Sequence, residues 1–265
     1  LPESFTFEED ESLLVDFTSY VDDIDEDGLT LTVSDNDSIT VDIVSFDVTF
    51  GAVQNWNGTE TLTFTVNDNQ GRSIASDDVN IIVSLVNDAP VLTDIDSQQT
   101  SEDTSLTITV SAEDVDNAEL SFNVSSDNDA VSVSISSDEL TMIPDLNYFG
   151  TVNITVTVSD GFLIDSETFE LTINPVNDRP VLTSIGVQET DEDIPLTITL
   201  SANDVEEDDL YFEAESDSTL VVVLIADNQL TMTPIENWNG TANITVTVTD
   251  GGTPNESDSE VFVLT

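Results

Sequence analysis

The sequence of 265 residues contains no cysteine, no histidine and no lysine, and its two basic side chains are Arg72 and Arg179. Without cysteine there are no disulfides and no thiolate metal ligands, so cysteine usage does not assign a redox compartment. The chain also lacks the usual general bases, thiol nucleophiles and Schiff-base amines. Paired carboxylates can catalyse glycoside hydrolysis. However, the acids are the same in every repeat described below, so no single domain stands out as an active site, and we expect no enzymatic activity.

Long apolar runs are also missing. The longest, residues 220–226, is far too short to cross a bilayer. No signal peptide opens the chain, and it does not begin with Met. We therefore interpret it as a segment of a longer protein or as a processed form.

Carboxylates are in large excess: 56 Asp and Glu residues give a formal net charge of −54. Nucleic acids and anionic membrane surfaces need cations facing them, which excludes both as partners. Apolar residues make up 38% of the chain and alternate with the acids, unlike the composition of a disordered acidic tail. The partner that such a surface favours is a cation.

Internal repeats divide the chain into three copies. Each copy carries a Glu-Asp pair, an Asn-aromatic loop and an Asp after a Val-rich run, in one order. The pairs are Glu9-Asp10, Glu102-Asp103 and Glu192-Asp193; the loops begin at Asn55, Asn147 and Asn237; the later acids are Asp68, Asp160 and Asp250. These landmarks predict domains at residues 1–88, 89–178 and 179–265.

Within each copy, apolar and polar residues alternate with the period of a half-buried strand. The second copy predicts strands near 91–98, 105–112, 119–125, 130–136, 138–143, 152–159 and 165–174. The predicted fold is therefore all-β, with three tandem Greek-key β-sandwiches in an extended string. The aromatic residues Trp56, Tyr148 and Trp238 are either a glycan-binding platform or, as we favour, a plug between the two sheets.

Oxygen-bearing side chains gather at the predicted domain ends. The segments Val86–Pro90 and Val176–Pro180 interrupt the sheets, because proline cannot donate to a strand ladder, and each carries an Asn-Asp pair. Alternate acids (Asp23/Asp25, Asp114/Asp116, Asp204/Glu206) follow the second strand of each copy. Such clusters suit Ca²⁺ better than Mg²⁺, and without a cation their charges repel. The competing interpretation is a halophile-like surface of solvated acids, and we assign Asp127, Asp129, Asp217 and Glu256 to that class.

These motifs, with Val-Thr-Asp250-Gly-Gly-Thr-Pro, resemble the cadherin-like and bacterial Ig-like tandem repeats of large bacterial surface proteins and adhesins. The resemblance covers all three copies and implies Ca²⁺ between consecutive domains. The ligands it implies at the first junction are Glu9 (with Asp10 as the alternative), Asn87, Asp88, Asp114, Asp116 and Asp160. Those at the second junction are Glu102 (with Asp103 as the alternative), Asn177, Asp178, Asp204, Glu206 and Asp250. Asp23, Asp25 and Asp68 would face an upstream neighbour, and Glu192 a downstream linker.

The sequence departs from the cadherin pattern in places. Leu85 and Pro175 stand where cadherins usually have another Asp, and the Asp-Arg-Glu motif is missing. Asn55 and Asn147 are either further oxygen ligands or, as we favour, residues that cap turns. We therefore expect one or two ions per junction.

The resemblance implies an extracellular, cell-surface stalk segment whose partners are calcium ions and neighbouring repeats. The alternative is an adhesive or filament-forming module that binds glycans or identical chains. A binding assay on single copies separates the two, because a stalk segment binds only metal.

Overall fold

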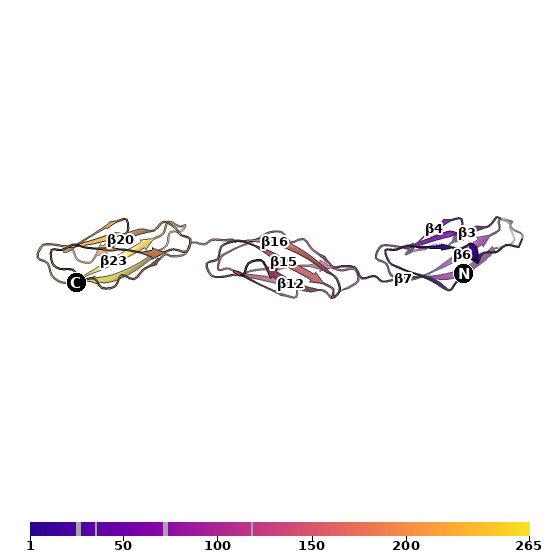
Figure 1. The fold of residues 1–265 in the computed structure, drawn as a ribbon, viewed down its shortest axis with the longest axis horizontal. Helices are drawn as coiled ribbons and strands as arrows, with labels where there is room; N and C mark the ends of the chain where they lie inside the picture. The colour runs from indigo at the N-terminus through magenta and orange to yellow at the C-terminus, as the bar shows by residue number, and fades with distance from the viewer. Residues whose placement is uncertain (25–27, 35, 71–73, 118) are drawn as a thin grey trace. The chain divides into compact units, whose positions relative to one another are not determined.

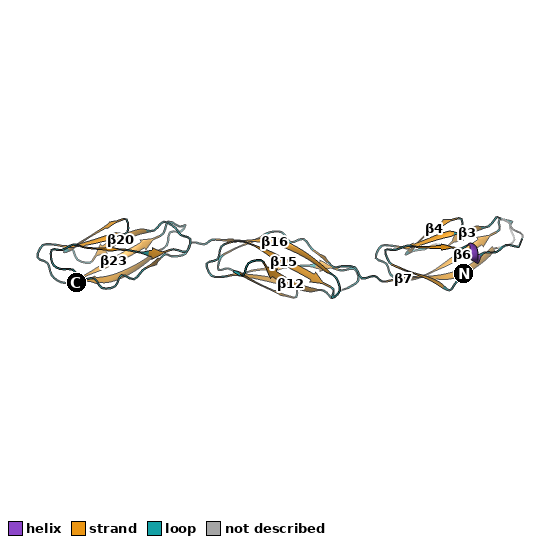
Figure 2. Ribbon diagram, viewed as in Figure 1, coloured by secondary structure: helices purple, strands orange, loops and turns teal. Residues whose placement is uncertain are grey.

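The computed structural model describes residues 1–24, 28–34, 36–70, 74–117 and 119–265, and their regular structure is nearly all β-strand (Figures 1 and 2). Asp25 and Arg72 lie outside the described residues. The chain divides into two compact units, which we describe separately. The first comprises Leu1–Thr93, Ser111–Ser121 and Thr157–Ser166. The second comprises Asp94–Val110, Phe122–Val156 and Glu167–Thr265.

The first unit contains a complete β-sandwich. One sheet has the order β1 (Ser4–Glu8), β7 (Ile74–Ser84), β6 (Gly58–Asn67), β3 (Thr30–Val33). The other has the order β2 (Leu13–Asp16), β5 (Asp47–Ala52), β4 (Ile39–Val44), and the turn η1 (Thr18–Tyr20) follows β2. The core is aromatic: the rings of Phe17 and Phe64 lie 5.0 Å apart, and Phe50 is fully buried. The alternation of apolar and polar residues in the sequence places these side chains between the sheets.

The second repeat supplies three sheets. Their orders are β12–β15–β16–β9, β10–β14–β13 and β11–β8. The strands are β8 (Val91–Leu92), β9 (Gln98–Ser101), β10 (Leu106–Thr109), β11 (Ala112–Glu113), β12 (Ser121–Ser126), β13 (Val131–Ser136), β14 (Glu139–Pro144), β15 (Gly150–Ser159) and β16 (Ile164–Asn174).

The predicted strands at 91–98 and 105–112 are each wrong as single elements. The structure splits them into β8 and β9, and into β10 and β11, which belong to different sheets. Near the first break, side-chain carboxylates take the place of a neighbouring strand as acceptors of backbone hydrogen bonds. The backbone N–H of Leu92 donates to the carboxylate of Asp165 at 2.9 Å, and that of Ile95 donates to Glu167 at 2.9 Å.

The third repeat lies wholly in the second unit and repeats the arrangement. Its sheets have the orders β20–β23–β24, β18–β22–β21 and β17–β19. The strands are β17 (Val181–Leu182), β18 (Leu196–Thr199), β19 (Ala202–Asn203), β20 (Tyr211–Ser216), β21 (Val221–Ala226), β22 (Gln229–Pro234), β23 (Ala242–Thr249) and β24 (Ser257–Leu264). Leu230, Met232 and Ile244 are fully buried between the sheets.

Two of the three Asn-aromatic loops place their aromatic residue against a domain core. Trp56 and Trp238 are partly buried and pack against the cores of the first and third repeats, which supports the plug interpretation for both. The loop residues Asn55, Asn147 and Asn237 have φ values of 57°, 58° and 59°, the left-handed geometry of a turn that Asn tolerates. The turn role expected of Asn55 and Asn147 is confirmed.

Two acids that we assigned to plain solvated surface also accept hydrogen bonds from residues of neighbouring strands. Asp127 accepts hydrogen bonds from the backbone and side chain of Asn153, at 2.9 and 2.8 Å. Asp217 accepts the same pair from Asn243, at 2.8 and 2.7 Å. The Asn153 bonds lower the pKa of Asp127. Both acids remain exposed, as their assignment to the solvated surface predicts, and each also fixes a neighbouring strand through these hydrogen bonds.

Candidate metal centres

All six residues predicted for the first junction lie in the first compact unit, and we call this set the first site. Each stands at the end of an element. Glu9 follows β1, Asn87 and Asp88 lie in the link after β7, Asp114 and Asp116 follow β11, and Asp160 follows β15. The ends of these strands therefore bring oxygen-bearing side chains from four separate segments of the chain close together.

Hydrogen bonds connect these segments through the link. The backbone N–H of Val86 donates to Glu9 Oε1 at 2.6 Å, and that of Asp88 donates to Asp116 Oδ2 at 2.7 Å. The side chain of Asn87 donates to Asp160 Oδ2 at 2.5 Å. Asp114 Oδ1 accepts the N–H of Asp116 at 2.8 Å. The structure thus brings together every residue of the predicted set.

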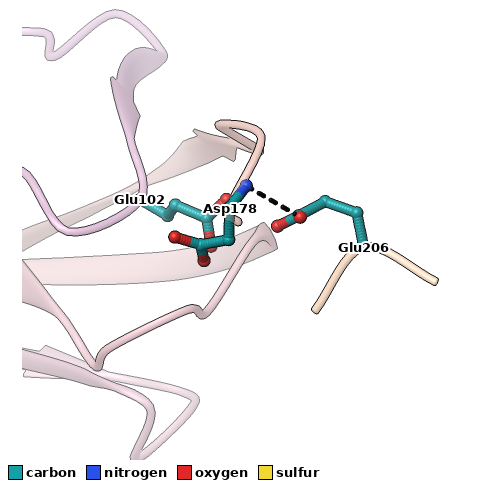
Figure 3. Close-up of side chains that lie close together, drawn as sticks. All are labelled: Glu102, Asp178 and Glu206. Carbon is teal, nitrogen blue, oxygen red and sulfur yellow. Dashed lines mark hydrogen bonds between the residues drawn. The ribbon is translucent and has the colours of Figure 1, made fainter. Parts of the chain in front are cut away.

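The second site is the set Glu102, Asn177, Asp178, Asp204, Glu206 and Asp250, and all of it lies in the second unit. Its bonding follows the same plan. The N–H of Val176 donates to Glu102 Oε1 at 2.6 Å, and that of Asp178 donates to Glu206 Oε2 at 3.0 Å. The side chain of Asn177 donates to Asp250 Oδ2 at 3.1 Å. Glu102, Asp178 and Glu206 each offer a carboxylate oxygen, and these atoms lie within 4.8 Å of one another (Figure 3).

Burial distinguishes these groups from solvated surface acids. Glu9 is 1% exposed, Glu102 is 2% exposed and Asp250 is fully buried. Eight buried side-chain oxygens have no hydrogen-bond partner within the described part of the chain, and every one belongs to the two sites. They are Glu9 Oε2, Asp88 Oδ2, Asp114 Oδ2, Glu102 Oε2, Asn177 Oδ1, Asp178 Oδ2, Asp204 Oδ2 and Glu206 Oε1. A buried acceptor without a partner costs about 1–3 kcal/mol, or more when charged. These oxygens therefore fit a cation.

The electrostatics agree with this fit. Desolvation and then the charges of Asp116, Asp10, Glu9 and Asp114 raise the pKa of Asp88. Desolvation likewise raises the pKa of Glu102, with contributions from the charges of Glu206, Asp103 and Asp178. A divalent cation among these groups offsets both the desolvation and the charge repulsion that raise the two pKa values.

Asp160 and Asp250 behave differently. The hydrogen bond from Asn87 is the largest cause of a lowered pKa at Asp160. Burial opposes ionisation of Asp250, but hydrogen bonds from the Glu256 backbone, the Asn177 side chain and the Gly252 backbone outweigh it and lower its pKa. Both acids are thus held ionised, each beside the linker Asn of its site.

Within each Glu-Asp pair, the two acids have separate roles. Asp103 is exposed and has a φ of 58°, and its carboxylate accepts the N–H of Asn147 at 2.9 Å. Asp10 is exposed in the same geometry beside Asn55. The buried Glu9 and Glu102 point into the sites instead. The geometry favours the glutamates over the aspartates as ligands.

Two contributors were missed from the sequence. Asn117 donates its side chain to Asn87 Oδ1 at 3.0 Å and so orients the linker amide. Its position directly after the alternate acids was the available signal. Gly252 lies against Asn177: a Cβ built on this glycine would stand 1.6 Å from Asn177 Oδ1.

The acids expected to face outer neighbours differ from one another in their surroundings. Asp68 accepts the N–H of Gln70 at 2.9 Å, and Asp25 lies outside the described residues. Glu192 is exposed, unlike its counterparts Glu9 and Glu102. We assign these residues no role.

The family profile of the bacterial Ig domain matches residues 2–82 and 87–173, more than half of the sequence. The chain belongs to the bacterial Ig domain family. A second profile, for the cadherin-like domain, matches residues 176–263 of this bacterial Ig chain. Together the matches indicate roughly three domains. No curated protein sequence matches the chain.

Solved structures similar to this bacterial Ig chain include cadherin extracellular domains. Protocadherin Gamma C5 EC1-3 has a TM-score of 0.55 at 17% identity, with 98% of each chain covered. Extracellular domains 3–6 of Protocadherin Gamma B2 score 0.54 at 17% identity, covering 98% of this chain and 70% of that one. The Protocadherin GammaB4 extracellular domain scores 0.51 at 14% identity, covering 89% and 44%, so this chain spans less than half of it. These likenesses confirm the predicted sandwich fold.

Bacterial Ig and cadherin-like domains are typically non-enzymatic modules of extracellular or surface proteins, and cadherin-like domains generally bind Ca²⁺. No helix in the described ranges is long and apolar enough to cross a membrane. The family therefore suggests an adhesion or stalk module.

Proposed function

We propose that this chain is a stalk segment of a large extracellular bacterial surface protein or adhesin, and that Ca²⁺ bound at the first and second sites stiffens its domain junctions. The domains are those set by the repeats, 1–88, 89–178 and 179–265. One observation carries the proposal: the eight buried oxygens without partners all belong to residues that the repeat pattern had selected as ligands. Solvated surface acids do not account for this coincidence, because they are exposed and distributed over the surface.

The ion at the first site would be held by Glu9, Asp88 and Asp114, with Asn87, Asp116 and Asp160 completing the oxygen set. The corresponding acids at the second site are Glu102, Asp178, Asp204 and Glu206, with Asn177 and Asp250. Ca²⁺ supplies positive charge and accepts six to eight oxygens in flexible geometry. We expect one or two ions at each site.

The chain's own residues couple the ion to the junction. Glu9 belongs to one repeat, Asp88 to the link, and Asp114 to the next repeat. A cation bound by all three ties the three segments together. Without the ion, like charges repel within each site, and the link is free to bend.

A glycan-binding function has less support. The aromatic residues that could stack on a sugar, Trp56 and Trp238, are partly buried against the cores of their domains.

Small-angle X-ray scattering of the chain during calcium titration tests the stiffening. With calcium, we expect scattering from one well-defined conformer. In chelator, we expect the profile of a flexible chain, and restored calcium should reverse the change. A chain with the same profile in both conditions would show that the ions do not set the junction geometry.

A further inference from the structure

The strand β21 lies at an edge of the sheet β18–β22–β21 in the third repeat. It pairs with β22 on one side. On its other side it is hydrogen-bonded to no strand of the described sheets, although β20 of the opposite sheet lies close to it. Val221 is buried at 3% exposure, whereas Val222 and Leu224 on the outer face are 57% and 67% exposed. The strand contains no charge, proline or glycine. Such an edge exposes backbone groups that can pair with another strand.

The whole outer face of this sheet is uncharged. Its outward positions are Thr197, Thr199, Val222, Leu224, Ala226, Gln229, Thr231 and Thr233. In contrast, the same face carries Glu139 in the second repeat, and Asp16, Asp42 and Asp47 in the first. A face without carboxylates is unexpected in a chain with 56 acids.

The corresponding edge strands show that the fold does not need this apolar surface. At the outward positions β13 has Ser132, Ser134 and Ser136. The first repeat has Thr40, Asp42 and Val44 in β4. All three strands keep inward apolar residues, so the core does not explain Val222 and Leu224.

We propose that β21 is a self-association edge, at which two copies of this chain pair their β21 strands antiparallel and join two sheets into one. A cationic protein would be drawn to the acidic faces instead. A second copy carries the same net charge of −54, so it can approach closely only at a face without carboxylates. Pairing of identical edge strands about a two-fold axis is self-complementary, and it satisfies backbone groups on both chains. The proposal does not rest on the calcium sites, because β21 belongs to neither.

The test is sedimentation equilibrium of the chain at moderate salt over a range of concentrations. The variant Val222→Ser/Leu224→Ser copies the serines of β13, so the third domain should still fold. We expect a monomer–dimer equilibrium in the wild type. Its dissociation constant should rise by at least ~10-fold in this variant. The control Val261→Ser changes a residue of similar exposure, 61%, on β24 of the opposite sheet, and should leave the equilibrium unchanged. A wild-type chain that stays monomeric, or an equal loss in the control, would overturn the proposal.

Crosslinking provides a second measurement that does not depend on comparing affinities. The chain has no cysteine, so Leu224→Cys introduces a single thiol near the middle of β21. We expect mild oxidation to yield a covalent dimer from Leu224→Cys and none from Val261→Cys. Equal yields from both variants would contradict pairing through β21.

Discussion

Asp178→Asn is expected to change the stability of the chain in opposite directions with and without calcium. In chelator the variant should melt higher, because Glu102 and Glu206 lose a like charge within 4.8 Å. Screened by solvent, this relief is of the order of 1 kcal/mol, or roughly 4–8 °C for a domain of this size. In calcium the variant should melt lower than the wild type, because the second site loses a charged ligand and its affinity falls by about 100-fold or more.

Thermal melts monitored by circular dichroism, in chelator and in calcium, measure both changes in melting temperature. The matched control is Asp129→Asn, which removes the same charge from an exposed acid outside both sites. It should shift neither melt appreciably. A variant that is less stable than the wild type in both conditions would show that Asp178 has a structural role independent of cations.

Gly252→Ala is expected to weaken the second site and leave the first site intact. The new Cβ would stand 1.6 Å from Asn177 Oδ1, so Asn177 must move. It would then lose its hydrogen bonds to Asp250 at 3.1 Å and to the Pro254 carbonyl at 2.9 Å. Displacing a ligand or its support commonly costs about 10–100-fold in metal affinity. Calcium titration calorimetry should show this loss at one class of site.

The neighbouring glycine provides the control for that substitution. A Cβ on Gly251 would lie 3.5 Å from the Asp209 carbonyl oxygen, which is ordinary contact. Gly251→Ala should therefore bind calcium like the wild type. If the two alanine variants lost affinity equally, loop strain rather than displacement of Asn177 would be the cause.

The fold was predictable from the sequence because its main determinants are local. Alternation in runs such as 152–159 indicates which residues face the core, and β15 covers that run. The site residues were also accessible, since three copies of one pattern mark the same acids. The family matches and the sandwich neighbours confirm the predicted fold.

What the sequence could not show depends on contacts between distant segments. The break between β8 and β9 coincides with backbone donation to Asp165 and Glu167, which lie more than 70 residues away. The hydrogen bonds from Asn153 to Asp127 and the clash that constrains Gly252 are also tertiary. No periodic pattern in the local sequence indicates these tertiary contacts. Burial of Glu9 and Glu102, with Asp10 and Asp103 turned outward, likewise required coordinates.

The most direct test of the central claim is calcium titration calorimetry on the wild type, Asp88→Asn and Asp178→Asn. The account predicts saturable calcium binding by the wild type. Asp88→Asn should remove the binding assigned to the first site alone, and Asp178→Asn that of the second alone. If the wild type shows no saturable binding, or both variants bind as it does, the buried carboxylates are not calcium ligands and the stalk mechanism proposed here is wrong.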